Sequence, residues 1–169
     1  MIVLGIDPGT LNMGYGLVTG DDAEPQMLCC GVVTAKPRDA ISERLRILYR
    51  GLEDIIRQYN PDEVAVEEPF FAENARSALA IGRAQAVAIL AAANRGLPVF
   101  QYTPLLIKQT LTDYGRASKE QMQEMVRLQL RLRECPHPSD AADALAIAIC
   151  HMRQQRLNRL LASSERRTR

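Results

Sequence analysis

The sequence predicts one α/β domain built on a mixed five-stranded sheet with helices on both faces. Two observations carry this prediction. Three short apolar segments come first, and their connections are too short to hold a helix, which is typical of antiparallel neighbours. Helix-like and strand-like segments then alternate, and a strand that follows a helix runs parallel to an earlier one. The length of 169 residues suits a single compact domain.

The three opening segments cover residues 2–7, 13–19 and 27–34. They are rich in Val, Ile, Leu and Tyr and are bounded by Gly, Asp and Pro, as strands are. We therefore expect an antiparallel meander. Side chains alternate between the two faces of a strand, so Gly5 shares a face with Asp7 and leaves room there for a metal ion or a helix end.

The middle of the chain supplies two helices and two strands. Residues 39–59 carry Leu and Ile every three or four positions, which indicates an amphipathic helix. Residues 63–67 follow as a strand, residues 74–94 as an Ala-rich helix, and residues 98–102 as the last strand. We expect the strand over 63–67 to run parallel to the first strand and to lie beside it, near the middle of the sheet.

Helices end the chain. We expect them at about 104–113, 118–130 and 139–158, separated by Gly115 and by the Pro-His-Pro segment at 136–138.

The C-terminal residues differ from the rest in charge. Residues 153–169 carry six arginines and a single acidic residue, Glu165, although the whole chain has a net charge of +1. We therefore divide the chain into a domain over 1–155 and a basic tail over 156–169. The tail is expected to be mobile and to attract phosphate groups.

Composition excludes several classes of protein. Hydrophobic residues make up 47% and charged residues 24%, which is typical of a globular domain and not of a disordered chain. Apolar runs are all shorter than the ~20 residues that span a bilayer, and a signal peptide pattern is missing. The four cysteines lack a metal-binding spacing, so we expect free thiols in a cytoplasmic protein.

Carboxylates stand at the ends of predicted buried elements. Asp7 ends the first strand, Glu67 ends the fourth, and Asp140 and Asp143 open the last helix. Gathering so much negative charge is unfavourable unless a cation offsets it, and Mg²⁺ binds through a few carboxylates together with substrate phosphates. Alternation along the strand places Glu68 on the opposite face from Glu67.

Each of these motifs alone also has an ordinary structural interpretation. The Asp-Pro-Gly-Thr segment at 7–10 is a common turn, although a similar segment binds phosphate in actin-like ATPases. Asp140 and Asp143 could simply cap their helix. Phe70 and Phe71 could belong to the core or could stack on unpaired bases.

Taken together, four segments resemble the RuvC family of bacterial Holliday-junction resolvases, which belongs to the ribonuclease-H-like superfamily. They are Gly5-Ile6-Asp7-Pro8-Gly9-Thr10, Val66-Glu67-Glu68-Pro69-Phe70, Ile107-Lys108-Gln109-Thr110 and Asp140-Ala141-Ala142-Asp143-Ala144-Leu145-Ala146-Ile147-Ala148. The similarity runs from residue 1 to about residue 152. It implies a ribonuclease-H-like sheet and a Mg²⁺-dependent endonuclease that resolves four-way DNA junctions by paired symmetric cuts during recombination and repair.

The resemblance also implies residue roles. Asp7, Glu67, Asp140 and Asp143 match the catalytic acids that bind two Mg²⁺ ions, Lys108 and Lys119 match basic residues at the scissile strand, and Phe70 matches an aromatic residue near the junction centre. Members of the family are homodimers and cooperate with the RuvA–RuvB branch-migration complex. Two other classes stay open at this point: an actin-like ATP-binding module, which would need two such domains, and a catalytically inactive DNA-binding protein.

The Ala-rich helix offers a surface for a dimer. Ala78, Gly82 and Ala86 recur every four residues, and such a smooth stripe lets two helices approach closely. The same stripe could instead pack against the sheet of its own subunit.

Overall fold

A computed structural model describes residues 1–20, 24–68, 75–112 and 114–167. Its sheet has the strand order β3-β2-β1-β4-β5. The strands are β1 (Ile2–Asp7), β2 (Asn12–Thr19), β3 (Gln26–Thr34), β4 (Glu63–Glu67) and β5 (Val99–Tyr102). The first three strands are antiparallel, whereas β4 runs parallel to both β1 and β5, which confirms the predicted mixed sheet and its central pair.

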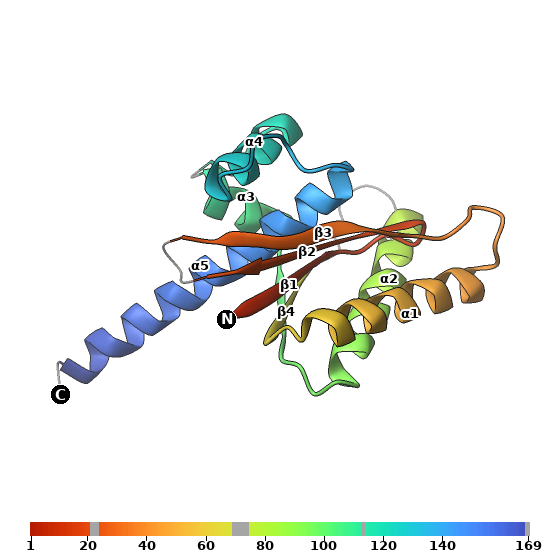
Figure 1. The fold of residues 1–169 in the computed structure, drawn as a ribbon, viewed down its shortest axis with the longest axis horizontal. Helices are drawn as coiled ribbons and strands as arrows, with labels where there is room; N and C mark the ends of the chain where they lie inside the picture. The colour runs from red at the N-terminus through yellow and green to blue at the C-terminus, as the bar shows by residue number, and fades with distance from the viewer. Residues whose placement is uncertain (21–23, 69–74, 113, 168–169) are drawn as a thin grey trace.

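Helices cover both faces of this sheet (Figure 1). They are α1 (Ile41–Tyr59), α2 (Ala75–Ala93), α3 (Pro104–Thr112), α4 (Lys119–Gln129) and α5 (Ser139–Arg167). Leu4, Ile6, Val64 and Val66 point to one face and form a core with α1 and α2. Val3 and Ala65 point to the other and form a second core with α3, α4 and α5, as the alternation of side chains requires.

Small residues seat α5 directly on the sheet. A Cβ atom added to Gly5 would lie 2.1 Å from the carbonyl oxygen of Ala144, and one added to Gly14 would lie 2.0 Å from that of Asp140. Gly14 is the β2 partner of Asp7. The expected room beside Asp7 is therefore filled by the first turns of α5, which bring Asp140 to the end of β1.

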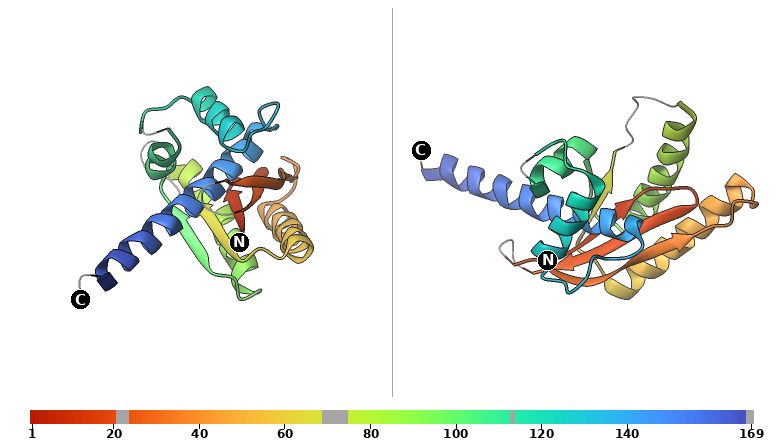
Figure 2. Two further views of the ribbon diagram at one scale, coloured as in Figure 1. Left: turned by 60° about the vertical axis from the view of Figure 1, so that its left-hand side comes forward. Right: turned by 90° about the horizontal axis from the view of Figure 1, so that it is seen from above.

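The last helix is longer than the sequence pattern predicts. It continues to Arg167 instead of ending near 158, so the proposed boundary at 155/156 falls inside a helix. Proline and glycine are missing between 139 and 167, and Leu, Ala, Arg and Gln are good helix formers, so nothing local stops it. The end of this helix extends beyond the sheet (Figures 1 and 2), and residues 156–167 are called the C-terminal arm. Its mobility stays a prediction.

The small-residue stripe on α2 is divided between two environments. Ala78 is buried against its own subunit. Gly82 faces open space, because a Cβ atom added there would meet nothing within 4 Å, and Ala86 is exposed. Leu79 and Leu90 are 56% and 53% exposed. The open face of α2 is thus lined by Leu79, Gly82, Ala86 and Leu90.

The four cysteines are free. Within the described residues, the helices are all too short or too polar to cross a membrane.

Candidate active site

Three of the predicted acids meet at the end of β1. Asp7 is the last residue of β1, while Asp140 and Asp143 lie in the first turns of α5, three positions apart on one face of the helix. One carboxylate oxygen from each lies within 4.8 Å of the other two. Gly14 makes this convergence possible, because any larger residue there would displace the backbone of α5 at Asp140.

Glu67 approaches the same place from β4. It ends that strand and follows Ala65 on the face that packs against α5. Its carboxylate is outside the group of three, but it takes part in a hydrogen bond with Asp7, which offsets part of the rise that burial causes in the pKa of Glu67. The backbone around it is held on both sides: Gln85 donates to the Glu67 carbonyl at 3.2 Å, and the Glu68 amide donates to the Tyr102 carbonyl at 2.9 Å.

Burial and mutual repulsion make these carboxyl groups weak acids. Burial raises the pKa of Asp7 to about 7, and the negative charges of Glu67, Asp143 and Asp140 add to the effect. Burial likewise raises the pKa of Glu67 to about 7, with Asp143 as the next cause. These groups are therefore poised to release their protons when a cation arrives.

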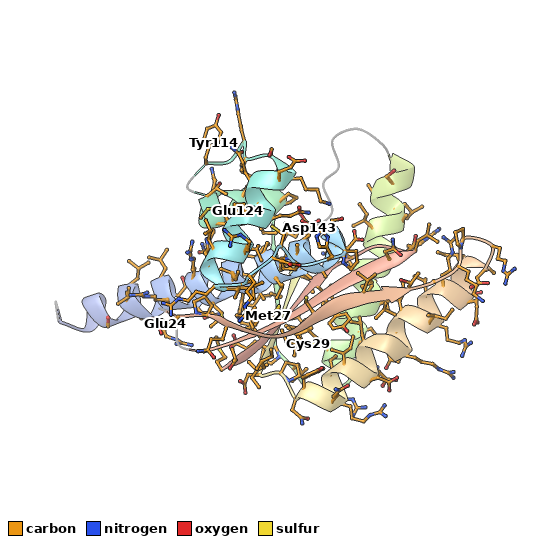
Figure 3. The ribbon with its side chains drawn as sticks, turned by 45° about the horizontal axis from the view of Figure 1, so that its top comes forward. Glu24, Met27, Cys29, Tyr114, Glu124 and Asp143 are labelled. Carbon is orange, nitrogen blue, oxygen red and sulfur yellow. The ribbon has the colours of Figure 1, made fainter. Side chains whose placement is uncertain are left out.

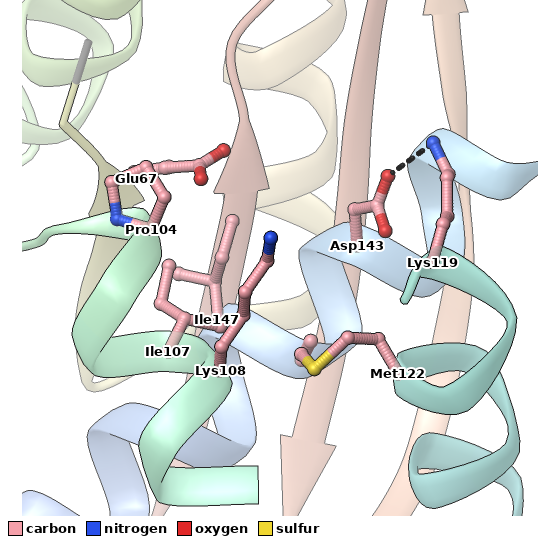
Figure 4. Close-up of a pocket in the computed structure, with 9 residues that line it drawn as sticks. Glu67, Pro104, Ile107, Lys108, Lys119, Met122, Asp143 and Ile147 are labelled. Carbon is pink, nitrogen blue, oxygen red and sulfur yellow. Dashed lines mark ion pairs between the residues drawn. The ribbon is translucent and has the colours of Figure 1, made fainter. Parts of the chain in front are cut away.

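Both predicted lysines lie at this site. The Lys119 ammonium pairs with the Asp143 carboxylate at 2.9 Å, and this contact raises the pKa of Lys119. Lys119 is the first residue of α4, whose start is fixed by a capping box at Ser118. Lys108, on α3, is close enough to Glu67 that its charge offsets part of the rise that burial causes in the pKa of Glu67. Figure 4 shows Glu67 and Lys108 on one side of a hollow and the Asp143–Lys119 pair on the other.

The hollow is a cavity of about 270 Å³ between β4, α3, α4 and α5. Besides the four charged residues, its lining consists of Pro104, Ile107, Met122, Ala146 and Ile147. These apolar residues were not among those predicted for the site. The sequence contained one indication of this lining: Ile147 follows Asp143 by four residues and so lies on the same face of α5. The apolar lining strengthens electrostatic interactions with any group that enters.

The donor set fits a hard divalent cation. Carboxylate oxygens are the ligands that Mg²⁺ prefers, and a substrate phosphate completes its coordination. The carboxylate oxygens of Asp7, Asp140 and Asp143 lie close enough together to act as such ligands. The Glu67 carboxylate lies beside them, hydrogen-bonded to Asp7. Figure 3 shows Asp143 at the start of α5, beside α4, with Tyr114 on the far side of α4 pointing away from the body of the protein. Phe70, predicted to contact DNA, lies outside the described residues.

Comparison with known proteins supports the resemblance. The RuvC family profile, described as crossover junction endodeoxyribonuclease RuvC, matches residues 3–151. A crossover junction endodeoxyribonuclease RuvC of Dehalococcoides mccartyi is 51% identical over 165 residues, which is 98% of this chain and 99% of the relative. A RuvC from Alkaliphilus oremlandii is 49% identical over 89% of this chain and 92% of its own.

Solved structures agree with the sequence relatives. Thermus thermophilus RuvC in complex with a Holliday junction substrate superimposes with a TM-score of 0.88 at 37% identity, covering 94% of this chain and 96% of that one. The yeast mitochondrial Holliday junction resolvase Ydc2 shares the fold, with a TM-score of 0.66 at 17% identity over 90% of this chain and 78% of its own. With the fold, the converging carboxylates and these matches, the chain belongs to the RuvC family of crossover junction endodeoxyribonucleases.

Proposed function

We propose that this protein is a metal-dependent endonuclease that resolves four-way DNA junctions by paired, symmetric phosphodiester hydrolysis in recombination and repair. The observation that carries the proposal is the convergence of Asp7, Asp140 and Asp143, with Glu67 beside them, at one end of the sheet. An ordinary turn or helix cap does not require carboxylates from β1, β4 and α5 to lie together. An ATP-binding module of the actin type is disfavoured because the family match covers nearly the whole chain.

Mg²⁺ is the metal we propose, with two ions per site. Bound there, the ions would activate the attacking water and stabilise the leaving oxygen. Asp7, Glu67, Asp140 and Asp143 would hold them, and their negative charge explains why a cation is needed. Lys108 and Lys119 flank the cavity on opposite sides and would place positive charge against the scissile phosphate. The Lys119 ammonium already offsets part of the negative charge of the site, because it pairs with the Asp143 carboxylate.

The partners are proposed on symmetry and on the resemblance. A junction with two-fold symmetry needs two matched cuts, which a homodimer supplies. We propose that the open face of α2 forms the dimer contact, that Phe70 contacts the junction centre, and that RuvA–RuvB is the partner machinery in the cytoplasm. The exposure of Leu79 and Leu90 supports the first of these points.

A synthetic four-way junction tests the nuclease proposal. With Mg²⁺, the wild type should make symmetric nicks, and Asp7→Asn or Glu67→Gln should lower the single-turnover rate by a factor of about 10³ or more. Both variants should bind the junction in Ca²⁺ at least as tightly as the wild type, because they lose repulsion toward phosphate. Glu68→Gln is the matched control and should cleave at nearly the normal rate. Cleavage by Asp7→Asn at the normal rate, or turnover of ATP instead of DNA, would contradict the proposal.

A further inference from the structure

A fully buried histidine bridges three elements behind the candidate active site. His151 lies on α5, and its side chain is inaccessible to solvent. Its Nε2 atom is 2.6 Å from Oε2 of Glu63 at the start of β4, and its Nδ1 atom is 2.7 Å from the hydroxyl oxygen of Tyr102 at the end of β5. The ring of Phe100 packs against it with a centroid separation of 4.6 Å. None of these residues lines the cavity that holds Glu67 and Asp143.

The position of each proton among Glu63, His151 and Tyr102 follows from the hydrogen-bond partners of the imidazole ring. A carboxylate only accepts, so the Nε2–H of His151 donates to Glu63. Burial lowers the pKa of His151, which favours a neutral ring, and Nδ1 is then an acceptor. Burial also raises the pKa of Tyr102, so its hydroxyl keeps a proton and donates to Nδ1. Each polar atom of the imidazole thus has one suitable partner.

The packing of α5 on the sheet indicates what the group formed by Glu63, His151 and Tyr102 does. The first half of α5 lies on the glycines of β1 and β2, with Ala144 and Ala148 over Gly5 and Leu145 over Gly16. These close contacts seat α5 on β1 and β2, but none of them involves β4, the strand that carries Glu67, or β5. A directional hydrogen-bonded group inside an apolar core selects one arrangement among several of similar packing energy.

The same arrangement determines how the acids meet. Asp143 and His151 are eight residues apart on one helix, about 12 Å along its axis at 1.5 Å per residue. Glu67 and Tyr102 are paired neighbours on β4 and β5, and Glu63 begins the strand that Glu67 ends. A shift of α5 against Glu63 and Tyr102 would therefore move Asp140 and Asp143 relative to Glu67.

We propose that Glu63, His151 and Tyr102 are positioning residues that fix α5 against β4 and β5 and so set the spacing of the metal-binding carboxylates. They act through the helix and the strands and do not touch the substrate or the metal. The inference rests on the proposed metal site.

Metal binding by the whole protein, without DNA, gives a direct readout. The rise of the melting temperature with increasing Mn²⁺ yields a half-saturating concentration. Tyr102→Phe removes only the hydroxyl and keeps the ring, and it should raise this concentration roughly tenfold, the usual effect of losing a group that orients metal ligands. Glu63→Gln keeps an acceptor oxygen for Nε2–H and should stay within about threefold of the wild type.

A core variant separates positioning from stability. Ile149→Val, in the same buried cluster and on the same helix, should lower the melting temperature without metal while leaving the half-saturating Mn²⁺ concentration unchanged. If Tyr102→Phe behaves like Ile149→Val, with a lower melting temperature and normal Mn²⁺ binding, the trio only stabilises the fold and the proposal is wrong. If Mn²⁺ shifts the wild type and Asp7→Asn equally, the metal site itself is wrong, and the inference falls with it.

Discussion

At the scale of single residues, folding buries carboxyl groups at the candidate site close to one another although their negative charges repel. Asp7 and Glu67 are buried beside other carboxylates, and the pKa of each is raised to about 7. The charge of Lys119 acts against the rise in the pKa of Asp7, but its effect is smaller than that of burial and of each of the three neighbouring acids. Part of the stability of the fold is thus given up to keep oxygen ligands close together, as is common at functional sites.

The free energy of unfolding should therefore depend on pH when divalent cations are removed. The pKa of Asp7 rises from 3.8 to about 7 and that of Glu67 from 4.5 to about 7. Between these values the folded state binds more protons than the unfolded state, so stability should fall as the pH rises from about 4 to about 8. Cations bind the deprotonated form, so Mg²⁺ should restore the most stability near pH 8.

Urea unfolding in EDTA over this pH range measures the effect. Asp7→Asn removes one titrating group and should have a flatter dependence than the wild type, and it should gain less from Mg²⁺. Parallel curves for the two proteins would show that the raised pKa does not govern stability.

The two lysines of the cavity should affect turnover more than binding. Lys119→Met and Lys108→Met each remove a positive charge beside the acids while keeping most of the side-chain length, and single-turnover cleavage should slow by roughly tenfold or more. Lys36, the remaining lysine of the chain, is exposed and does not line the cavity, so Lys36→Met is the control for loss of charge. Equal rates for all three variants would assign Lys108 and Lys119 to ordinary surface positions.

Residue identity was predictable where a polar group interrupts an apolar pattern. Asp7 and Glu67 end buried strands, and Asp140 and Asp143 open a buried helix, so each stood out without a structure. The structure brings all four to one end of the sheet. His151 gave no such signal, because a lone histidine in an Ala- and Ile-rich helix is typical of a core position. Its partners Glu63 and Tyr102 are distant in sequence, and only the fold shows the contact.

At the scale of elements, the packing of α5 on β1 and β2 determines the site. Strand alternation alone predicted that Gly5 would leave room beside Asp7, and the structure fills that room with backbone of α5. The end of this helix was not predictable in the same way. The segment from residue 156 onward was interpreted as a tail because its charge differs from that of the rest of the chain, whereas the absence of Pro and Gly was the better guide.

Adding one methyl group under α5 should disturb the site. In Gly5→Ala the new Cβ would lie 2.1 Å from the Ala144 carbonyl oxygen, so α5 must move, at a cost of about 1–3 kcal/mol of unfolding free energy. Cleavage at limiting Mg²⁺ should fall as well, since Asp140 and Asp143 move with the helix. Ala162→Val is the control: it adds carbon at an exposed position of the same helix and should change the free energy of unfolding by less than about 1 kcal/mol. Denaturant unfolding would compare them, and equal stabilities would contradict the proposed seat of α5.

The C-terminal arm should contribute charge more than shape to DNA binding. Truncation after Gln155 removes five arginines, and the slope of log affinity against log salt concentration should flatten by about one for each phosphate that the protein no longer neutralises. Replacing Arg156 and Arg159 by Gln keeps the helix formers and should give part of the same change. An unchanged slope in the truncated protein would mean that the arm does not bind DNA.

At the scale of the whole molecule, the symmetry of the proposed substrate requires two sites in fixed relation. One protomer has a single acidic centre among its described residues, at one end of the sheet. A heterologous contact would leave the second site in an arbitrary orientation, whereas a two-fold contact reproduces the symmetry of the junction. The open face of α2 is suited to such a contact, because Leu79 and Leu90 are more than half exposed and Gly82 between them admits another helix.

Gly82→Arg tests this assembly. The arginine has space within its own protomer, because nothing lies within 4 Å of the added Cβ, and it replaces a poor helix former, so the variant should fold. In a two-fold contact through α2 the new charges would face each other or face apolar groups, and the dimer should dissociate. Sedimentation should then report a folded monomer, and junctions should receive isolated nicks instead of paired cuts. Asn158→Arg adds the same charge on α5 and should remain dimeric. A Gly82→Arg protein that sediments as a dimer and cuts in pairs would exclude α2 as the interface.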